Sequence, residues 1–347
     1  MVRWSLRRGA ADIQIAPAPP PAEVEPELSD EARPEPNFSA EPAPEPDPAT
    51  AGWPPGGRWL ASGASVTGNG HLTKGLGCDD AFAYGTYGDF IVAAVADGAG
   101  SVTGTSAWGS FTVVDGVVTD ALTPEFVESL RKAPRAGDEL RGVMEALFGR
   151  ALKRLERRAE ESNLGIGKLA TTLAVAVALP GIAVFAQIGD GVIALRGIDG
   201  IRTVLTEDKG DYANLTWFVQ SESAFEQSFR VSVAEDVSAF ALSTDGMAYK
   251  ITTVATGAPF EPFFDAAWSW LESGIDDVTF AQWLCRVEND QTEDDKTLVL
   301  ALLAAPPGSP EAGADADCTT CRRSSGWPPP LPSEGAAPPP SRATEAR

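Results

Sequence analysis

The sequence predicts an α+β fold in which two β-sheets stack face to face and helices cover their outer sides. Apolar residues follow one another in several short runs, for example Leu169–Ala178 and Ile182–Gln187. Strands of this composition need cover on both faces. A helix with a single apolar stripe is expected at Asp138–Glu161, because its apolar residues recur every three or four positions. Two stacked sheets with helices outside satisfy both observations.

The expected elements alternate between strands and helices along the chain. Before the long helix we expect strands at Ala61–Thr67, Ala81–Tyr84 and Asp89–Ala96, and a helix at Thr105–Leu122. After it we expect strands at Leu169–Ala178, Ile182–Gln187, Val192–Arg196 and Lys296–Leu303. The turn dipeptides Pro180-Gly181 and Asp190-Gly191 separate three of them. The basic face of the long helix, Lys153, Arg154, Arg157 and Arg158, is expected in solvent, with partner docking as the alternative.

Both ends of the 347-residue chain differ in composition from its middle. Residues 1–58 are rich in Pro, Ala and Glu, and residues 306–347 are rich in Pro, Ala, Gly and Ser. Such segments bury too little apolar surface to offset their chain entropy, so we expect both to be disordered. Residues 59–305 are long enough for one domain with a sizeable core.

The net charge of −22 argues against nucleic acid as a partner, because a protein that binds the phosphate backbone needs a basic surface. The chain lacks a run of about twenty apolar residues, so we expect no membrane-spanning helix and no membrane partner. The basic segment Met1–Arg8 is not followed by the apolar stretch of a secretory signal. We therefore expect a cytoplasmic protein, and a monomer.

The four cysteines do not have the pattern of a disulfide framework. Cys318 and Cys321 have the spacing of half a zinc site, but no second pair and no nearby His accompany them. We interpret them as an incidental or redox-labile pair. Cys78 is interpreted as a small buried residue, because the sequence offers no convincing Cys-His pair.

Four acidic elements lie at the ends of apolar runs, namely Asp97-Gly98, Asp190-Gly191, Asp245-Gly246 and Asp294-Asp295. They are far apart in the sequence and can meet only through the tertiary fold. Carboxylate oxygens are the ligands that Mg²⁺ and Mn²⁺ prefer, so the ordered set indicates a metal site. Each Asp-Gly pair alone has a simpler interpretation, because this dipeptide is typical of hairpin turns.

In order and spacing, these motifs resemble those of the bacterial metal-dependent serine/threonine protein phosphatases of type 2C. The strongest matches are Val95–Gly100, Ser243–Met247 and Asp294–Val299, and the supporting ones are Asp79–Phe82, Ala170–Leu173, Gly189–Gly191 and Tyr212–Thr216. The resemblance extends from about Ser62 to Leu303. It implies a four-layer α-β-β-α sandwich with two central, mostly antiparallel sheets flanked by helices.

The resemblance also implies two Mn²⁺ or Mg²⁺ ions as cofactors, and it leaves a third ion open. The implied metal ligands are Asp79, Asp80, Asp97, Gly98 through its carbonyl, Asp190, Asp245 and Asp294. Asp97 would bridge the two ions, with Asp245 and Asp294 on the far side. Asp79 is one methylene shorter than the Glu of the family, so it would reach its ion through a water.

Two departures from the family pattern affect the catalytic residues. Many members have a His after the bridging Asp-Gly, where this chain has Ala99. The one His of the chain, His71, precedes the acidic pair. It is our candidate for the residue that serves either the leaving group or the phosphate. Many members also carry a phosphate-binding Arg where this chain has Gly75. The neighbouring Lys74 supplies a positive charge but cannot form the bidentate hydrogen bonds of a guanidinium.

Hydrolysis of a phosphate ester on serine or threonine is the function that the resemblance implies. Two bridged divalent ions lower the pKa of a shared water and offset charge on the phosphoryl oxygens, so no nucleophilic side chain is needed. Phosphorylated proteins are the expected partners, with a serine/threonine kinase as a further candidate. The alternatives are a pseudophosphatase that binds phosphoproteins or a kinase without turnover, and a structural sandwich whose Asp-Gly pairs are only turns. Thr171 and Thr172 are interpreted as support for the sheet.

Overall fold

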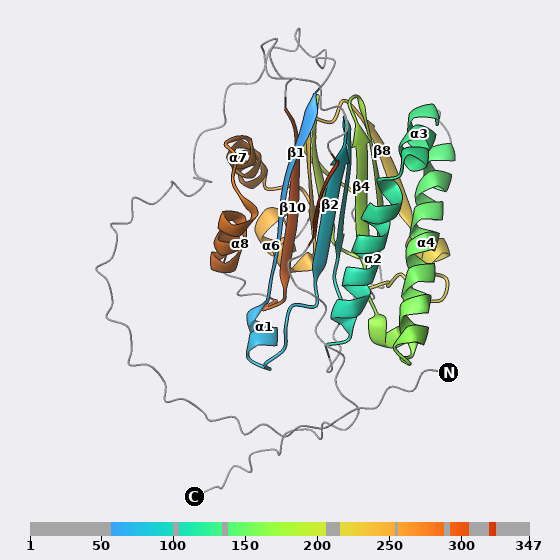
Figure 1. The fold of residues 1–347 in the computed structure, drawn as a ribbon. Helices are drawn as coiled ribbons and strands as arrows, with labels where there is room; N and C mark the ends of the chain where they lie inside the picture. Colours follow the sequence, from blue (N-terminus) through green and yellow to red (C-terminus); the bar gives the residue numbers. More distant parts are fainter. Residues whose placement is uncertain are drawn as a thin grey trace, which may run out of the picture. The chain divides into compact units, whose positions relative to one another are not determined.

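Two antiparallel sheets lie face to face, and helices cover the outer side of each (Figure 1). The structure is a computed structural model that describes residues 57–99, 104–133, 138–205, 216–253, 256–287, 292–304 and the backbone of 319–323. The stacked sheets with helices on their outer sides confirm the predicted α-β-β-α sandwich. In the described part of the chain no helix is long and apolar enough to cross a membrane.

The two sheets differ in size, and every neighbouring pair of strands runs antiparallel. The five-stranded sheet has the order β1 (Arg58–Val66), β10 (Lys296–Ala304), β9 (Ala239–Ser243), β6 (Val192–Gly197) and β7 (Gly200–Val204). The six-stranded sheet has the order β11 (Thr319–Arg323), β2 (Ala81–Tyr87), β3 (Phe90–Ala96), β4 (Leu173–Leu179), β5 (Ile182–Ile188) and β8 (Arg230–Glu235).

Different helices cover the two sheets. The six-stranded sheet packs against α2 (Ser106–Ala121), α3 (Pro124–Lys132) and α4 (Glu139–Glu161). The five-stranded sheet packs against α6 (Ala248–Ile251), α7 (Glu261–Glu272) and α8 (Asp277–Arg286). Short helical segments lie in the connections: α1 (Asn69–Leu72), η2 (Ile166–Leu169), α5 (Ala224–Gln227) and η3 (Asp245–Met247).

The uninterrupted apolar runs are explained by burial on both faces of each strand. In β3, Val92 and Ala94 point to the helices, whereas Ile91, Ala93 and Val95 point to the opposite sheet. All of these residues are almost fully buried. The sequence pattern thus identified the buried strands β3, β5 and β10, whereas β7 and β8 were not predicted.

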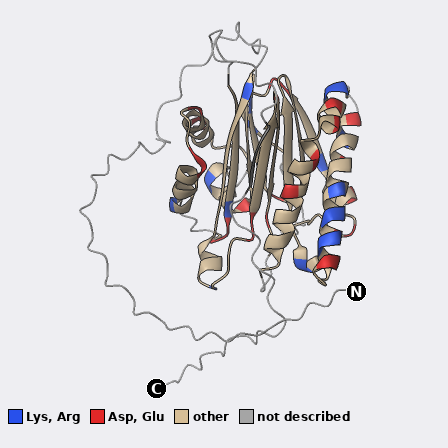
Figure 2. Ribbon diagram, viewed as in Figure 1, with Lys and Arg blue, Asp and Glu red and all other residues tan. Residues whose placement is uncertain are grey.

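The basic face of α4 is only partly in solvent. Figure 2 shows basic residues along this helix, in contrast with the largely uncharged strands. Lys153 and Arg157 are exposed, as expected. Arg154, however, forms an ion pair with Asp120 of α2, and the guanidinium of Arg158 lies 3.9 Å from the ring centre of Trp108. Half of this face therefore fixes α4 to α2.

Two expectations need correction. The predicted strand Leu169–Ala178 begins only at Leu173, because η2 ends at Leu169 and the next residues contact the backbone of Asp97. Within the tail that we expect to be disordered, Thr319–Arg323 forms strand β11, which pairs with β2 from Thr319 opposite Tyr87 to Arg323 opposite Ala83. The expectation is wrong for these five residues. Cys318, Tyr212 and the rest of both tails lie outside the described residues, apart from Gly57 and Arg58.

Candidate active site

Strand pairing in the six-stranded sheet brings two of the predicted site residues together. Asp80 directly precedes β2, and Asp97 directly follows β3. These strands pair antiparallel with Ala81 opposite Ala96, so their acidic neighbours emerge at the same edge of the sheet. The side chains of Asp80 and Asp97 lie close enough that the charge of Asp97 raises the pKa of Asp80.

The five-stranded sheet supplies the rest of the acidic cluster at the same end. Ser243 of β9 lies opposite Leu298 of β10, so Asp245 after β9 lies beside the segment before β10 that contains Asp294. Asp190, in the connection from β5 to β6, is close enough to raise the pKa of Asp97 and Asp245. Its Oδ2 accepts a hydrogen bond from Thr216 Oγ1 at 2.9 Å.

The glycines that follow Asp97 and Asp245 are needed for close backbone approach. A Cβ on Gly98 would lie 2.5 Å from the carbonyl oxygen of Asp79, and one on Gly246 would lie 1.9 Å from that of Asp295. Neither glycine has a positive φ, and neither lies in a hairpin turn. For these two motifs, the explanation as simple turns is wrong.

Burial and mutual repulsion raise the pKa of the clustered carboxyls. Burial raises the pKa of Asp80 and Asp97 well above the usual value, and the charges of neighbouring carboxylates raise it further. The pKa of Asp245 is raised to about 7, first by burial and then by the charges of Asp190 and Asp294. Burial also raises the pKa of Asp294. A bound cation would relieve this repulsion.

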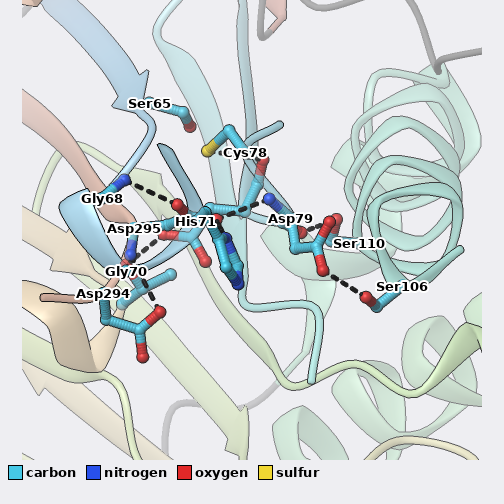
Figure 3. Close-up of polar contacts among 12 residues, drawn as sticks. Ser65, Gly68, Gly70, His71, Cys78, Asp79, Ser106, Ser110, Asp294 and Asp295 are labelled. Carbon is cyan, nitrogen blue, oxygen red and sulfur yellow. Dashed lines mark hydrogen bonds and ion pairs between the residues drawn. The ribbon is translucent and has the colours of Figure 1, made fainter. Parts of the chain in front are cut away.

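Asp79 is hydrogen-bonded to helix α2. Its Oδ2 accepts a hydrogen bond from Ser106 Oγ at 2.6 Å, and its carbonyl oxygen accepts one from Ser110 Oγ at 2.5 Å (Figure 3). The side chain is buried, and burial raises its pKa although the bond from Ser106 lowers it. The short acidic side chain is therefore engaged with α2.

A cleft of about 340 Å³ opens beside the acidic cluster. Its lining includes His71, Lys74, Asp97, Gly98, Glu293 and Asp294. Lys74 is exposed and is the one lysine or arginine among the described residues that line the cleft. Gly75, at the position of the family's arginine, has a φ of 69° in the left-handed region. The structure thus brings both predicted catalytic residues to the cleft, whereas Asp79, Asp80, Asp190 and Asp245 are not among its described lining residues.

Threonine side chains fix the carboxylate-bearing segments, and the sequence indicated only part of this. Thr172 Oγ1 accepts from the N–H of Asp97 at 3.0 Å, and Thr171 Oγ1 donates to its carbonyl oxygen at 3.0 Å. Thr244 Oγ1 donates to Asp80 Oδ2 at 2.7 Å. Thr171 and Thr172 were expected to support the sheet, whereas the bond from Thr244 was missed because it joins residues 164 positions apart.

Asp295 is a second residue that sequence reasoning missed. Its side chain is 2% exposed and accepts hydrogen bonds from the loop that carries His71 and Asp79 (Figure 3). The doubled acid Asp294-Asp295 directly before the buried strand β10 was the available signal.

The carboxylate and carbonyl oxygens of the cluster suit a hard divalent cation. Their side chains are not arranged around one common point. In the described part of the chain, no three His, Cys, Asp or Glu side chains have the geometry of a metal site. The carboxylates are nevertheless close enough to raise the pKa values of one another. All of the available donors are carboxylate or carbonyl oxygens, which match Mg²⁺ and Mn²⁺. The residues present therefore fit such ions by chemistry and by their unfavourable charge repulsion.

Comparison with known proteins gives a consistent set of similarities. The family model described as Protein phosphatase 2C matches residues 67–285. Serine/threonine-protein phosphatase 3 of Escherichia coli (strain K12) is 29% identical over 265 residues, which cover 71% of this chain and 99% of that protein. Among solved structures, the S. agalactiae serine/threonine phosphatase is 13% identical with a TM-score of 0.47, covering 71% of this chain and 99% of that one. A bacterial serine phosphatase is 14% identical with a TM-score of 0.46, covering 71% and 98%.

Proposed function

Because the chain belongs to the protein phosphatase 2C family, whose family model matches residues 67–285, we propose that it removes phosphate from serine and threonine side chains of other proteins. The name of the E. coli relative supports this substrate class. The observation that carries the proposal is the acidic cluster beside the cleft, in which burial and neighbouring charges raise the pKa of Asp80, Asp97 and Asp245.

We assign the cluster to two Mg²⁺ or Mn²⁺ ions. Asp97 and Gly98 line the cleft. Asp97 would be a ligand of both ions and the Gly98 carbonyl a further ligand, and Asp245 and Asp294 would hold the ion on one side. Asp80, beside Asp97, is assigned to the other side, with Asp79 acting through a water and Asp190 available for a third ion. When bound, such ions lower the pKa of water and offset the charge of a phosphoryl group.

The side chains at the cleft suit the remaining steps of the hydrolysis. Lys74 attracts the phosphate dianion by charge. The oxygen of a water molecule bonds to phosphorus, and the bond from phosphorus to the serine or threonine oxygen breaks. That oxygen keeps the electron pair and takes the Nε2 proton of His71 in the form protonated on both ring nitrogens, which leaves a neutral ring with its proton on Nδ1. The attacking water loses a proton to solvent. The products are inorganic phosphate and the free hydroxyl side chain.

The pseudophosphatase alternative is not favoured. All of the acidic positions of the family pattern are filled in this chain, with Asp79 as the one shortened member. The structure also holds the carboxylates in a repulsive arrangement that a cation would relieve.

Hydrolysis of p-nitrophenyl phosphate and of a phosphothreonine peptide by the full chain tests the proposal. We expect release of phosphate from both with Mn²⁺ or Mg²⁺ present, loss of activity after chelation, and recovery when the ion is restored. An inactive protein that still binds the phosphopeptide would favour the pseudophosphatase instead. Activity that survives complete chelation would contradict the assigned metal chemistry.

A further inference from the structure

We propose that Asp295 is a positioning residue, which holds the loop Gly68–Asp80 in place and fixes which ring nitrogen of His71 faces the cleft. The proposal rests on the proposed function, because it assigns the support of the proton donor in that reaction. Asp295 itself is not a metal ligand in this assignment and does not touch the substrate.

A single carboxylate closes the loop at both ends. Asp295 Oδ1 accepts a hydrogen bond from the N–H of Gly68 at 2.8 Å, and Oδ2 accepts one from the N–H of Asp79 at 2.6 Å. The loop therefore begins and ends on the same buried side chain, as Figure 3 shows. Since a buried carboxylate is stabilised when its oxygens receive several N–H groups, these bonds satisfy both oxygens.

The third contact of Asp295 is with the imidazole of His71. Its Oδ2 lies 2.9 Å from His71 Nδ1. A carboxylate can only accept, so the proton of this bond belongs to Nδ1. In Figure 3 the other ring nitrogen points away from Asp295, and His71 is part of the cleft lining. The bond therefore directs Nε2 to the position where a leaving oxygen would take its proton.

The backbone of the same segment packs tightly on the loop. The N–H of Gly70 donates to the carbonyl oxygen of Glu293 at 2.7 Å. A Cβ on Gly68 would lie 2.1 Å from the carbonyl oxygen of Asp294, so no larger residue fits there. The loop that carries the proton donor thus packs directly against the backbone of the Asp294 segment, with Asp295 as the polar link between them.

The chain has one histidine, which allows a direct test in the unmodified protein. In full-length protein made without a histidine tag and labelled with ¹⁵N-histidine, long-range ¹H–¹⁵N spectra report the protonation of each ring nitrogen of His71. We expect the neutral ring to carry its proton on Nδ1, both without metal and with diamagnetic Mg²⁺. A ring protonated on Nε2 in its neutral form overturns the proposal. This readout needs no activity, so it decides the proposal even if the proposed function fails.

Kinetics of variants provide the second test. In Asp295→Asn the amide offers one acceptor oxygen in place of two, so at least one of the three bonds is lost. Proton donation typically contributes about a hundred-fold when the leaving group is poor. We therefore expect His71→Ala and Asp295→Asn both to slow hydrolysis of the phosphothreonine peptide much more than hydrolysis of p-nitrophenyl phosphate. The p-nitrophenolate released from the second substrate leaves without a proton. The double variant should be no slower on the peptide than His71→Ala alone.

A matched control is Asp277→Asn. Asp277 also bridges distant elements through its carboxylate, because its Oδ1 accepts from Ser62 Oγ at 2.8 Å and from Tyr84 OH at 3.2 Å. It does not contact the loop, so its loss should affect both substrates equally. Equal losses on the two esters in Asp295→Asn, or additive losses in the double variant, would show that Asp295 does not act through His71.

Discussion

A carboxyl group that is buried beside other carboxyl groups opposes ionisation, and at the residue scale this property dominates the site. Asp97 and Asp245 are the clearest cases, because burial raises their pKa and neighbouring acids raise it further. We expect Asp97→Asn and Asp245→Asn each to remove phosphatase activity. At pH 8 without metal, we expect each to stabilise the fold, since a neutral amide replaces an opposed charge. Activity assays and urea unfolding measure the two effects.

Asp199→Asn is the control for these variants. Asp199 is exposed in the turn between β6 and β7, at the end of the sheet opposite the site. Its replacement should change neither activity nor stability. Normal turnover by either site variant would contradict the metal assignment, and failure of both to fold would show that the carboxylates are structural.

A second prediction at the residue scale concerns the substitution Gly246→Ala. A Cβ there would lie 1.9 Å from the carbonyl oxygen of Asp295, so Gly246→Ala forces β10 and the Asp245 segment apart. Overpacking of this kind costs about 1–3 kcal/mol, which should appear as a lower urea midpoint together with a loss of activity. Gly149→Ala is the matched control, because nothing lies within 4 Å of its Cβ position in α4. There we expect a gain of about 0.5–1 kcal/mol. Equal effects of the two substitutions would refute the packing argument.

Single residues also show how far the sequence could predict the site. Asp97, Asp245 and Asp294 could be identified because each follows or precedes an apolar strand in a recognisable motif. The role of Ser106 could not, because its bond to Asp79 depends on how α2 crosses the sheet. The contacts of Asp295 join residues more than two hundred positions apart, and no local pattern carries such information.

At the scale of elements, the prediction succeeded where a periodic pattern was long and unbroken. Strands β3 and β5 were identified because every residue in them is buried, and helix α4 because its buried residues form a single stripe. Helices α7 and α8 were not assigned, although Asp276 caps α8 by accepting a hydrogen bond from the N–H of Thr279. The predicted start of β4 was too early. Thr171 and Thr172 precede the strand, and their side chains form hydrogen bonds with the backbone of Asp97.

Strand β11 leads to a prediction about the tail. Shortening the chain to Arg58–Ala305 removes β11 but none of the assigned site residues. We expect this shortened chain to hydrolyse p-nitrophenyl phosphate as fast as the full chain. Removing β11 also uncovers the edge of β2, and exposed strand edges promote association. Light scattering should therefore show more self-association, and a shortened chain that is inactive would mean that the tail supports the site.

At the scale of the whole molecule, the site exists because two sheets end at the same place. The antiparallel registers set Asp80 beside Asp97 in one sheet and Asp245 beside Asp294 in the other. Stacking of the sheets through their shared apolar layer then brings the two pairs together. The apolar layer between the sheets thus holds together groups that repel one another, and this opposition makes stability depend on pH and metal.

The direction of that dependence follows from the raised pKa values. Asp245 has a usual pKa of 3.8 when unfolded and about 7 when folded, so between these values the folded protein binds more protons than the unfolded chain. The stability contributed by its protonated form is fully present below 3.8 and is lost as the pH rises through about 7. Asp80 and Asp97 act in the same direction.

We therefore expect the metal-free protein to become less stable as the pH rises from 5 to 8, in contrast with ordinary acid denaturation. Added Mg²⁺ should raise the melting temperature more at pH 8 than at pH 5, because the ion binds carboxylates that have lost their protons. Thermal melts at several pH values, with Mg²⁺ and with a chelator, measure both effects. Asp245→Asn should flatten the metal-free profile, since it removes one of the groups that titrate. A metal-free protein whose stability increases steadily from pH 5 to pH 8 would show that the clustered carboxyls do not control its stability.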